Sequence, residues 1–255
     1  MSTIITVFNQ KGGVGKTTTA LNLLAAIAQR GVRPLGIDLD PQAHLSHVFG
    51  VQPRLADDSI YSFFTRQRPL EDIARVSKSG IVVCPAHLDL AKLDSMLGKS
   101  VNIVTRLRQA LHAPDGPAGP VVIDTCPLFN VLSLNALFAC DLLIVPVSCD
   151  FLSLRGAREV ERALNALEPV FKQRLPRRYL ITRYDARRRM SADVVAQMMA
   201  TLRPEDVCAT RIRESVMLAE SPALELDVFR HAPGSSGALD YQALVDELVG
   251  AGFVT

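Results

Sequence analysis

The feature that most constrains this chain is a glycine-rich loop that joins an apolar run to a helical pattern near the start. Residues 4–8 are mostly apolar and mostly β-branched, which predicts a buried strand, and residues 17–30 have the apolar spacing of a helix. The loop between them reads KGGVGK from Lys11 to Lys16. Glycines let backbone N–H groups approach an anion, and the start of a helix adds positive charge. The sequence therefore predicts that this chain binds a nucleoside triphosphate.

Two residues of the loop have expected roles in binding phosphate. Lys16 is expected to reach the β- and γ-phosphates, and the Thr17 hydroxyl is expected to hold Mg²⁺. The usual pattern, G-x-x-x-x-G-K-[ST], would place its first glycine at position 10, where this chain has Gln10. A second lysine, Lys11, instead precedes the glycine pair. The predicted nucleotide contacts are Lys11, Gly12, Gly13, Val14, Gly15, Lys16, Thr17 and Thr18.

Apolar runs alternate with helical patterns along the 255 residues, which predicts an α/β fold. We expect one domain over residues 1–255, with a mostly parallel, twisted sheet and helices on both faces. Strands are predicted at 4–8, 34–38, 81–84, 121–124, 142–147, 178–183 and 207–212. Helices are predicted at 17–30, 43–49, 100–112, 131–138, 154–168, 191–202 and 238–249. Residues 51–80 are expected to be irregular with a short helix near 60–64, and residues 113–120 form a Pro- and Gly-rich surface connection.

Three aspartates come at the ends of predicted strands. Asp38 and Asp40 end the second strand and point the same way, because side chains at i and i+2 share a face. Asp124 ends another apolar strand. The carboxyl ends of parallel strands meet at one edge of a sheet, so Lys16, Asp40 and Asp124 should converge there. We expect Asp124 to hold the Mg²⁺ shell, directly or through water, although an Asp-Pro turn alone would also explain Asp38 and Asp40.

Composition narrows the class of protein. A chain with 48% hydrophobic and 21% charged residues is typical of a packed globule. Its five cysteines are scattered and form no C-x-x-C pair, which argues against a disulfide framework or a zinc site. The sequence contains no signal peptide or apolar run of transmembrane length, so a cytoplasmic location is expected. The net charge of +2 gives no general argument for nucleic acid, but arginines crowd residues 174–189. Such a cluster is either a solvated polar face or a surface for a polyanion.

The altered loop KGGVGKTT resembles the deviant Walker A loop of the ParA/MinD family of dimerising ATPases. The resemblance extends along nearly the whole chain and favours the ParA-like (Soj-like) branch. Residues 36–42 look like the family's DxDPQ motif, and residues 121–127 look like its Walker B strand, with Cys126 where a proline is usual. Residues 143–147, 180–185 and 218–222 resemble later landmarks. The resemblance implies a P-loop NTPase fold, ATP and Mg²⁺ as cofactors, and slow, partner-stimulated hydrolysis of ATP to ADP and phosphate.

The resemblance also implies roles for individual residues. Asp40 would orient or activate the attacking water, and Asp38 would support magnesium or the loop geometry. Lys11 would reach the nucleotide of a second subunit, so that ATP joins two copies of the chain. The alternative for Lys11 is that it only screens phosphates within its own chain. The implied catalytic residues are Lys11, Lys16 and Asp40, and the implied metal residues are Thr17, Asp38 and Asp124.

By resemblance, ParA-like members bind DNA without sequence preference, and Arg187 stands where they carry a DNA-binding arginine. The family segment I-P-R-N-V-R-L-x-E-A-P is altered here over residues 212–222. Glu214 and Met217 replace its two arginines, and Arg213 replaces its proline. Arg188, Arg189 and Arg213 could compensate for the lost DNA contacts, whereas the adenine contacts stay open. The acidic segment at 239–249 differs from the basic membrane helix of MinD-like members, so no membrane contact is expected.

Three functions remain open at the level of sequence. The ATPase could partition a plasmid or chromosome on the nucleoid with a ParB-like partner. The same cycle could position a protein cargo, such as a chemoreceptor cluster or microcompartment, through a cargo adaptor. A regulatory binding protein without turnover is a third possibility, but the intact Lys11, Lys16, Thr17, Asp40 and Asp124 argue against it.

Other chemistry has weaker support. A redox protein like the nitrogenase iron protein shares the loop, but no matching cysteine motif surrounds Cys84 or Cys126. His44 and His47 lie three residues apart without nearby cysteine or carboxylate support, which favours surface or partner contacts over a metal site.

Overall fold

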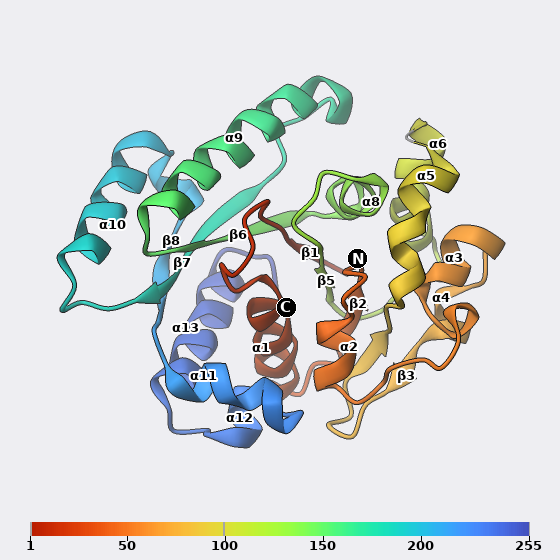
Figure 1. The fold of residues 1–255 in the computed structure, drawn as a ribbon, viewed down its shortest axis with the longest axis horizontal. Helices are drawn as coiled ribbons and strands as arrows, with labels where there is room; N and C mark the ends of the chain where they lie inside the picture. Colours follow the sequence, from red (N-terminus) through yellow and green to blue (C-terminus); the bar gives the residue numbers. More distant parts are fainter. Residues whose placement is uncertain (1, 99, 255) are drawn as a thin grey trace.

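Eight strands form one sheet in the order β3-β4-β2-β5-β1-β6-β7-β8, with helices on both faces (Figure 1). The computed structural model describes residues 2–98 and 100–254. Every neighbouring pair of strands is parallel except β3 and β4. The strands are β1 (Ile4–Val7), β2 (Leu35–Asp38), β3 (Arg75–Val76), β4 (Val82–Cys84), β5 (Val121–Asp124), β6 (Leu142–Ser148), β7 (Arg177–Tyr184) and β8 (Val207–Arg213). The predicted α/β fold with a mostly parallel sheet is confirmed.

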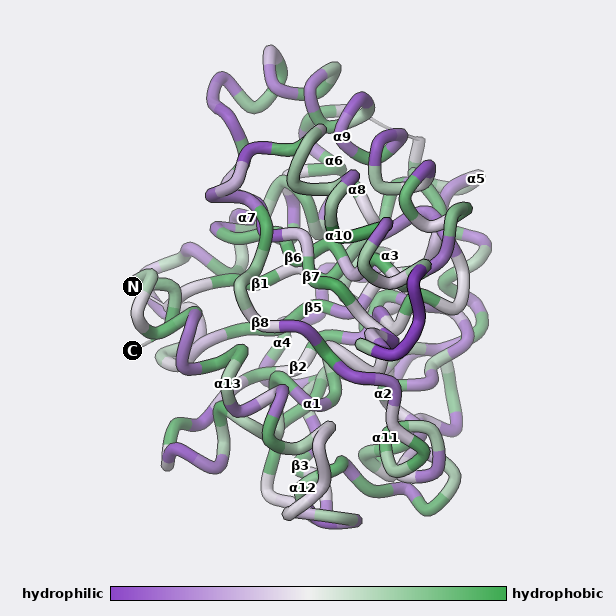
Figure 2. The backbone as a smooth tube through the Cα atoms, turned by 90° about the vertical axis from the view of Figure 1, so that its left-hand side faces the viewer, coloured by the Kyte–Doolittle hydropathy of each residue, from purple (hydrophilic) through white to green (hydrophobic). Residues whose placement is uncertain are grey.

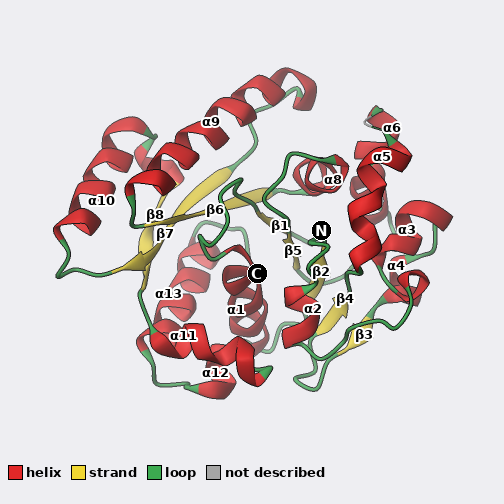
Figure 3. Cartoon of the chain, viewed as in Figure 1, coloured by secondary structure: helices red, strands yellow, loops and turns green. Residues whose placement is uncertain are grey.

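Helices pack against both faces because side chains alternate along each strand. Ile4 belongs to the core under α8 and α9, whereas Ile5 belongs to the core under α1 and α13 (Figure 3). The hydrophilic residues of α9 alternate with hydrophobic ones, as expected for a helix with one buried face (Figure 2). The helices are α1 (Lys16–Gln29), α2 (His44–Val48), α3 (Ile60–Arg66), α4 (Leu70–Ile73), α5 (Leu93–Leu97), α6 (Val101–Val104), α7 (Arg106–Leu111), α8 (Val131–Ala139), α9 (Phe151–Phe171), α10 (Arg189–Thr201), α11 (Val216–Glu220), α12 (Val228–His231) and α13 (Ser236–Gly250).

The long helices and strands were predicted from the sequence, whereas several short ones were not. All seven predicted strands are present, and β3 was not predicted because two exposed residues carry no periodic pattern. The helix predicted at 100–112 is instead two helices, α6 and α7, which are separated at Thr105. Helix α9 is longer than the predicted 154–168 at both ends. Asp150 caps it at the start, and the helix continues past Pro169, which lies in its last turn. Within residues 51–80 the predicted short helix is α3, and α4 was missed.

The parallel register brings three strand ends together. Val7 at the end of β1 and Asp38 at the end of β2 both pair with Asp124 at the end of β5. The loop that follows β1 therefore lies beside both aspartates. Within the described part of the chain, no helix is both long and apolar enough to cross a membrane.

Candidate functional site

The loop between β1 and α1 has a backbone that depends on glycine. Gly13 and Gly15 have φ values of +76° and +91°, a region that side-chain-bearing residues rarely adopt. Two polar side chains from distant positions hold the loop. Asn9 accepts a hydrogen bond from the Lys11 N–H at 3.0 Å and donates to the Pro146 carbonyl at 2.7 Å. Thr182 donates to the Val14 carbonyl at 2.9 Å, a contact that sequence reasoning missed.

Lys16 begins α1 and is largely buried, with 7% of its surface exposed. Its Nζ donates to the Lys11 carbonyl at 2.9 Å. Burial lowers the pKa of Lys16, while the charges of Asp124 and Asp40 act in the opposite direction. The structure therefore brings the predicted lysine next to two of the predicted aspartates.

Lys11 engages a carboxylate of its own chain. Its Nζ lies 2.5 Å from Asp150 Oδ1 and 2.7 Å from Ser153 Oγ. Asp150 also caps α9 by accepting the Ser153 N–H at 2.8 Å, and its Oδ2 accepts the hydroxyls of Ser148 and Ser153. Burial raises the pKa of Asp150, but the hydrogen bonds from Lys11 and the two serines outweigh it and hold that pKa well below its usual range. Sequence reasoning missed Asp150, since 139 residues separate it from Lys11.

Asp38 is fully buried and its carboxylate holds the turn that follows β2. Its oxygens accept the Asp40 N–H at 3.1 Å, the Ser46 N–H at 2.9 Å and the Ser46 hydroxyl at 2.6 Å. Burial raises the pKa of Asp38 to about 6, against the lowering effect of these hydrogen bonds. Asp40 stands just beyond the strand, 8% exposed, and accepts the Gln42 N–H at 2.9 Å. Asp38 thus positions the segment that presents Asp40 to the edge of the sheet.

Asp124 is fully buried, and the described residues leave one of its oxygens unsatisfied. Its Oδ1 accepts the Thr125 N–H at 3.0 Å, whereas Oδ2 has no hydrogen-bond partner of ordinary length among the described residues. Burial, followed by the charge of Asp38, raises the pKa of Asp124 well above its ordinary value, and Thr17 and Lys16 act in the opposite direction. An unsatisfied buried oxygen is costly, and a divalent cation would satisfy it. Asp124 and Thr17 therefore fit a magnesium ion that also takes phosphate and water ligands.

Among the described residues, histidine belongs to no candidate metal cluster. The described residues contain no group of three or more His, Cys, Asp or Glu that could hold a metal ion, so His44 and His47 do not form one. A magnesium ion bound through one or two protein oxygens and substrate phosphates needs no such group.

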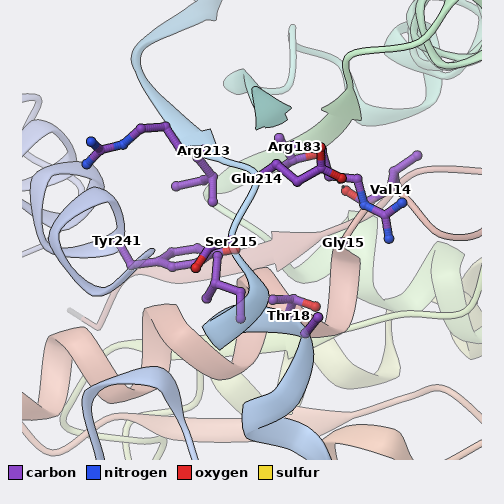
Figure 4. Close-up of a pocket in the computed structure, with 12 residues that line it drawn as sticks. Val14, Gly15, Thr18, Arg183, Arg213, Glu214, Ser215 and Tyr241 are labelled. Carbon is purple, nitrogen blue, oxygen red and sulfur yellow. Dashed lines mark hydrogen bonds between the residues drawn. The ribbon is translucent and has the colours of Figure 1, made fainter. Parts of the chain in front are cut away.

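A pocket of about 200 Å³ lies beside the loop (Figure 4). Its apolar lining includes Val14 of the loop and Ile212, Leu218 and Ala219 from β8 and α11. Its polar lining includes Arg183, Arg213, Glu214 and Ser215. The altered segment at 212–222 thus lines the space next to the predicted phosphate site. That position suits the base and sugar of a nucleotide whose phosphates occupy the loop.

The arginines predicted for DNA are exposed but paired within the chain. Arg187 pairs with Asp185 at 3.0 Å, and Arg188 pairs with Glu214 at 2.9 Å. Arg213 binds Asp240 through Nε and Nη2, with a shortest distance of 2.6 Å. Arg189, whose side chain is 95% exposed, has a single 4.0 Å contact, with Asp193, among the charged side chains that the structure describes. These carboxylate partners are Asp185, Asp193, Glu214 and Asp240, not the aspartates at the ends of β2 and β5.

This chain is similar to known proteins over nearly its whole length. Residues 2–176 match a protein family described as an AAA domain. The chromosome partitioning protein ParA of Caulobacter vibrioides is 33% identical over 250 residues, which cover 96% of this chain and 93% of that protein. The chromosome-partitioning ATPase Soj of Thermus thermophilus is 36% identical and covers 96% of this chain and 94% of its own.

Solved structures agree on the fold. A structure from Mycobacterium smegmatis, described as cobyrinic acid a,c-diamide synthase with bound ADP and magnesium, has a TM-score of 0.83 at 30% identity. The match covers 98% of this chain and 94% of that one. The apo McdA structure from Cyanothece has a TM-score of 0.84 at 18% identity and covers 97% of this chain and 100% of its own. At that identity the McdA similarity shows the fold alone.

Proposed function

This chain belongs to the ParA/MinD family of ATPases, and we propose that it hydrolyses ATP with Mg²⁺ to partition or position DNA on the nucleoid together with a ParB-like partner. The observation that carries the ATPase proposal is the meeting of Lys16, Asp40 and the unsatisfied Asp124 oxygen at one edge of the sheet. The partitioning proposal follows the names of relatives that are 33–36% identical over 96% of the chain.

The chain's own residues supply positioning and charge for phosphoryl transfer, which needs little covalent chemistry from the protein. Lys16 and the N–H groups of the loop hold the β- and γ-phosphates. Thr17 and Asp124 hold magnesium, which neutralises phosphate charge when bound. Asp40, just beyond the end of β2, orients the attacking water, and Asp38 fixes the turn from which Asp40 projects.

Lys11 is the residue through which ATP would join two copies of the chain. In one copy its ammonium already has a partner, Asp150. Dimerisation would exchange that carboxylate for the phosphates of the second subunit, where a cation supplied in trans is worth roughly 10³–10⁵ in rate. ATP binding and dimerisation would then strengthen each other equally.

DNA binding would use the exposed arginines Arg187, Arg188, Arg189 and Arg213. Contacts with phosphate carry no base information and weaken steeply with salt. A second candidate function, positioning of a protein cargo by the same cycle, is favoured by one observation. Glu214 occupies an arginine position of the family and pairs with Arg188, and Asp240 pairs with Arg213, so part of this surface is neutralised.

The dimer is tested with Asp40→Ala, which should trap ATP without hydrolysing it. Light scattering on this variant with saturating ATP and magnesium should give twice the mass of the chain, and adding Lys11→Ala should restore the monomer while ATP still binds. A monomer in Asp40→Ala itself would contradict the proposed dimer. If the ATP-bound dimer still forms in the variant with Lys11→Ala, Lys11 acts only on the phosphates bound by its own chain.

The two candidate functions, and a binding protein without turnover, are separated by two further assays. Basal phosphate release from the unmodified chain would exclude the regulatory alternative. Co-sedimentation with DNA in ATP, in ADP and without nucleotide, at two salt concentrations, tests the DNA surface. Binding that requires ATP and falls with salt supports partitioning on the nucleoid, and the absence of DNA binding in ATP would contradict it.

A further inference from the structure

Arg183 has an unusual backbone for its place in the fold. Its φ is +52°, a left-handed conformation that costs a side-chain-bearing residue roughly 1–3 kcal/mol. Gln67, Lys172 and Glu225 also have positive φ, but they are C-caps of helices, where the chain commonly turns this way, and Ala43 lies in the turn before α2. Arg183 lies inside strand β7 instead. The end of a helix therefore does not explain the left-handed backbone of Arg183.

The ladder between β7 and β8 is irregular at this residue. Ile181 pairs with Arg211 and Tyr184 pairs with Arg213, so three steps along β7 match two steps along β8. The extra residue is a bulge, which bends the strand and redirects a side chain, and bulges are frequent beside active sites. The residue before it, Thr182, anchors the Val14 carbonyl of the loop. The bulge is therefore tied directly to the predicted phosphate site.

The Arg183 side chain lines the pocket beside the loop and extends toward Val14 (Figure 4). It makes no hydrogen bond or ion pair with any described residue, whereas the nearby Arg188 and Arg213 each have a carboxylate partner. The rest of the pocket lining includes the apolar side chains of Ile212 and Leu218. A pocket lined by a planar guanidinium and by apolar side chains suits a flat aromatic ring.

We propose that Arg183 binds the nucleotide held by its own subunit, with its guanidinium packed against the base. The inference rests on the proposed ATPase function and adds a residue that the loop motif does not include. The bulge and the left-handed backbone of β7 would exist to aim this side chain into the pocket.

The test uses Arg183→Gly, because glycine adopts a positive φ without steric cost. The variant should be at least as stable to heat as the unmodified chain, and its affinity for ADP should fall roughly three- to thirty-fold, the range expected for a lost guanidinium–ring contact. Arg183→Lys should recover little of the affinity, since an ammonium group cannot stack flat on a ring. Arg203→Gly, the same change at an exposed arginine outside the pocket, should leave ADP affinity unchanged.

Titration with inorganic pyrophosphate distinguishes base from phosphate. Arg183→Gly should bind pyrophosphate as well as the unmodified chain does, because the lost contact involves the base. An equal loss for ADP and pyrophosphate would overturn base packing, and unchanged ADP affinity would overturn any nucleotide role for Arg183. If the unmodified chain itself failed to bind ADP, the proposed function would fail instead.

Discussion

Two charged regions of this chain differ in how far water reaches them. The phosphate edge, formed by Lys16, Asp38, Asp40 and Asp124, is buried or nearly so. The arginine surface, formed by Arg187, Arg188, Arg189 and Arg213, has side chains that are 50–95% exposed. At the phosphate edge, burial shifts pKa values, and an Asp124 oxygen has no hydrogen-bond partner of ordinary length in the part of the chain that the structure describes. At the arginine surface, local carboxylates pair with most of the guanidinium groups.

The comparison teaches where ligand affinity can come from. A charge out of contact with water interacts strongly with whatever replaces the water, because the local dielectric is low. An exposed ion pair is worth little and is screened by salt. Changes at the phosphate edge should therefore have large effects, and changes at the arginine surface should have small, salt-dependent ones.

Asp40→Asn gives the largest expected effect. Loss of the carboxylate that orients water should lower kcat for ATP hydrolysis by roughly 10²–10⁴-fold, while ATP affinity changes little. Phosphate release and ATP titration measure the two quantities. Asp115→Asn, a change at an exposed residue of the 113–120 connection, serves as the control. Near-normal turnover in the Asp40→Asn variant would show that Asp40 does not orient the attacking water.

Lys16→Ala should weaken ATP binding by roughly 30- to 3,000-fold, since it removes a buried cation from a polyanionic ligand. Isothermal titration with ATP and magnesium measures the loss. Lys78→Ala, an exposed lysine far along the chain, is the matched control and should bind normally. Equal affinities for the two variants would break the contrast between buried and exposed charge.

Asp124→Asn should stabilise the nucleotide-free chain by about 1–3 kcal/mol near neutral pH, because it removes a carboxyl group whose ionisation burial opposes. Burial raises the pKa of Asp124, so as pH rises from about 4 the unfolded chain ionises before the folded chain does. The unmodified chain therefore loses stability as pH rises through this window, and the variant does not share that loss. Thermal unfolding from pH 4 to pH 8 should show a growing difference in Tm.

Magnesium supplies the complementary observation for Asp124. ADP with magnesium should raise the Tm of the unmodified chain more than ADP with EDTA does, and Asp124→Asn should abolish that difference. An equal response to magnesium in both chains would show that Asp124 does not hold the ion.

Single changes at the arginine surface should have the smallest effects. Arg189→Ala should weaken DNA binding only a few-fold and reduce the slope of log K against log salt by about 0.9. Arg213→Ala should change that slope less, because Asp240 already neutralises this guanidinium. Anisotropy titrations of a DNA duplex at several salt concentrations measure both slopes. A steeper change for Arg213 than for Arg189 would reverse this ranking of the arginines.

The sequence by itself determined the parts of this protein that depend on neighbours along the chain. The strand, loop and helix around Lys16, the strand ends at Asp38 and Asp124, and the parallel sheet could all be predicted. Their periodicity and glycine pattern are local, and parallel strands must end at the same edge of the sheet. Two-residue β3 and the interruption at Thr105 could not be predicted, because they are too short to show a period.

Only the tertiary structure decided which distant side chains complete the site. Asp150 lies 139 residues from Lys11, and Thr182 lies 168 residues from Val14. No spacing rule connects such positions, because their contact depends on which strands become neighbours in the sheet. The bulge that aims Arg183 into the pocket likewise arises from pairing between β7 and β8. Residues close together in the sequence thus predicted where phosphate would bind. The packing of distant strands and helices decided which side chains surround that site.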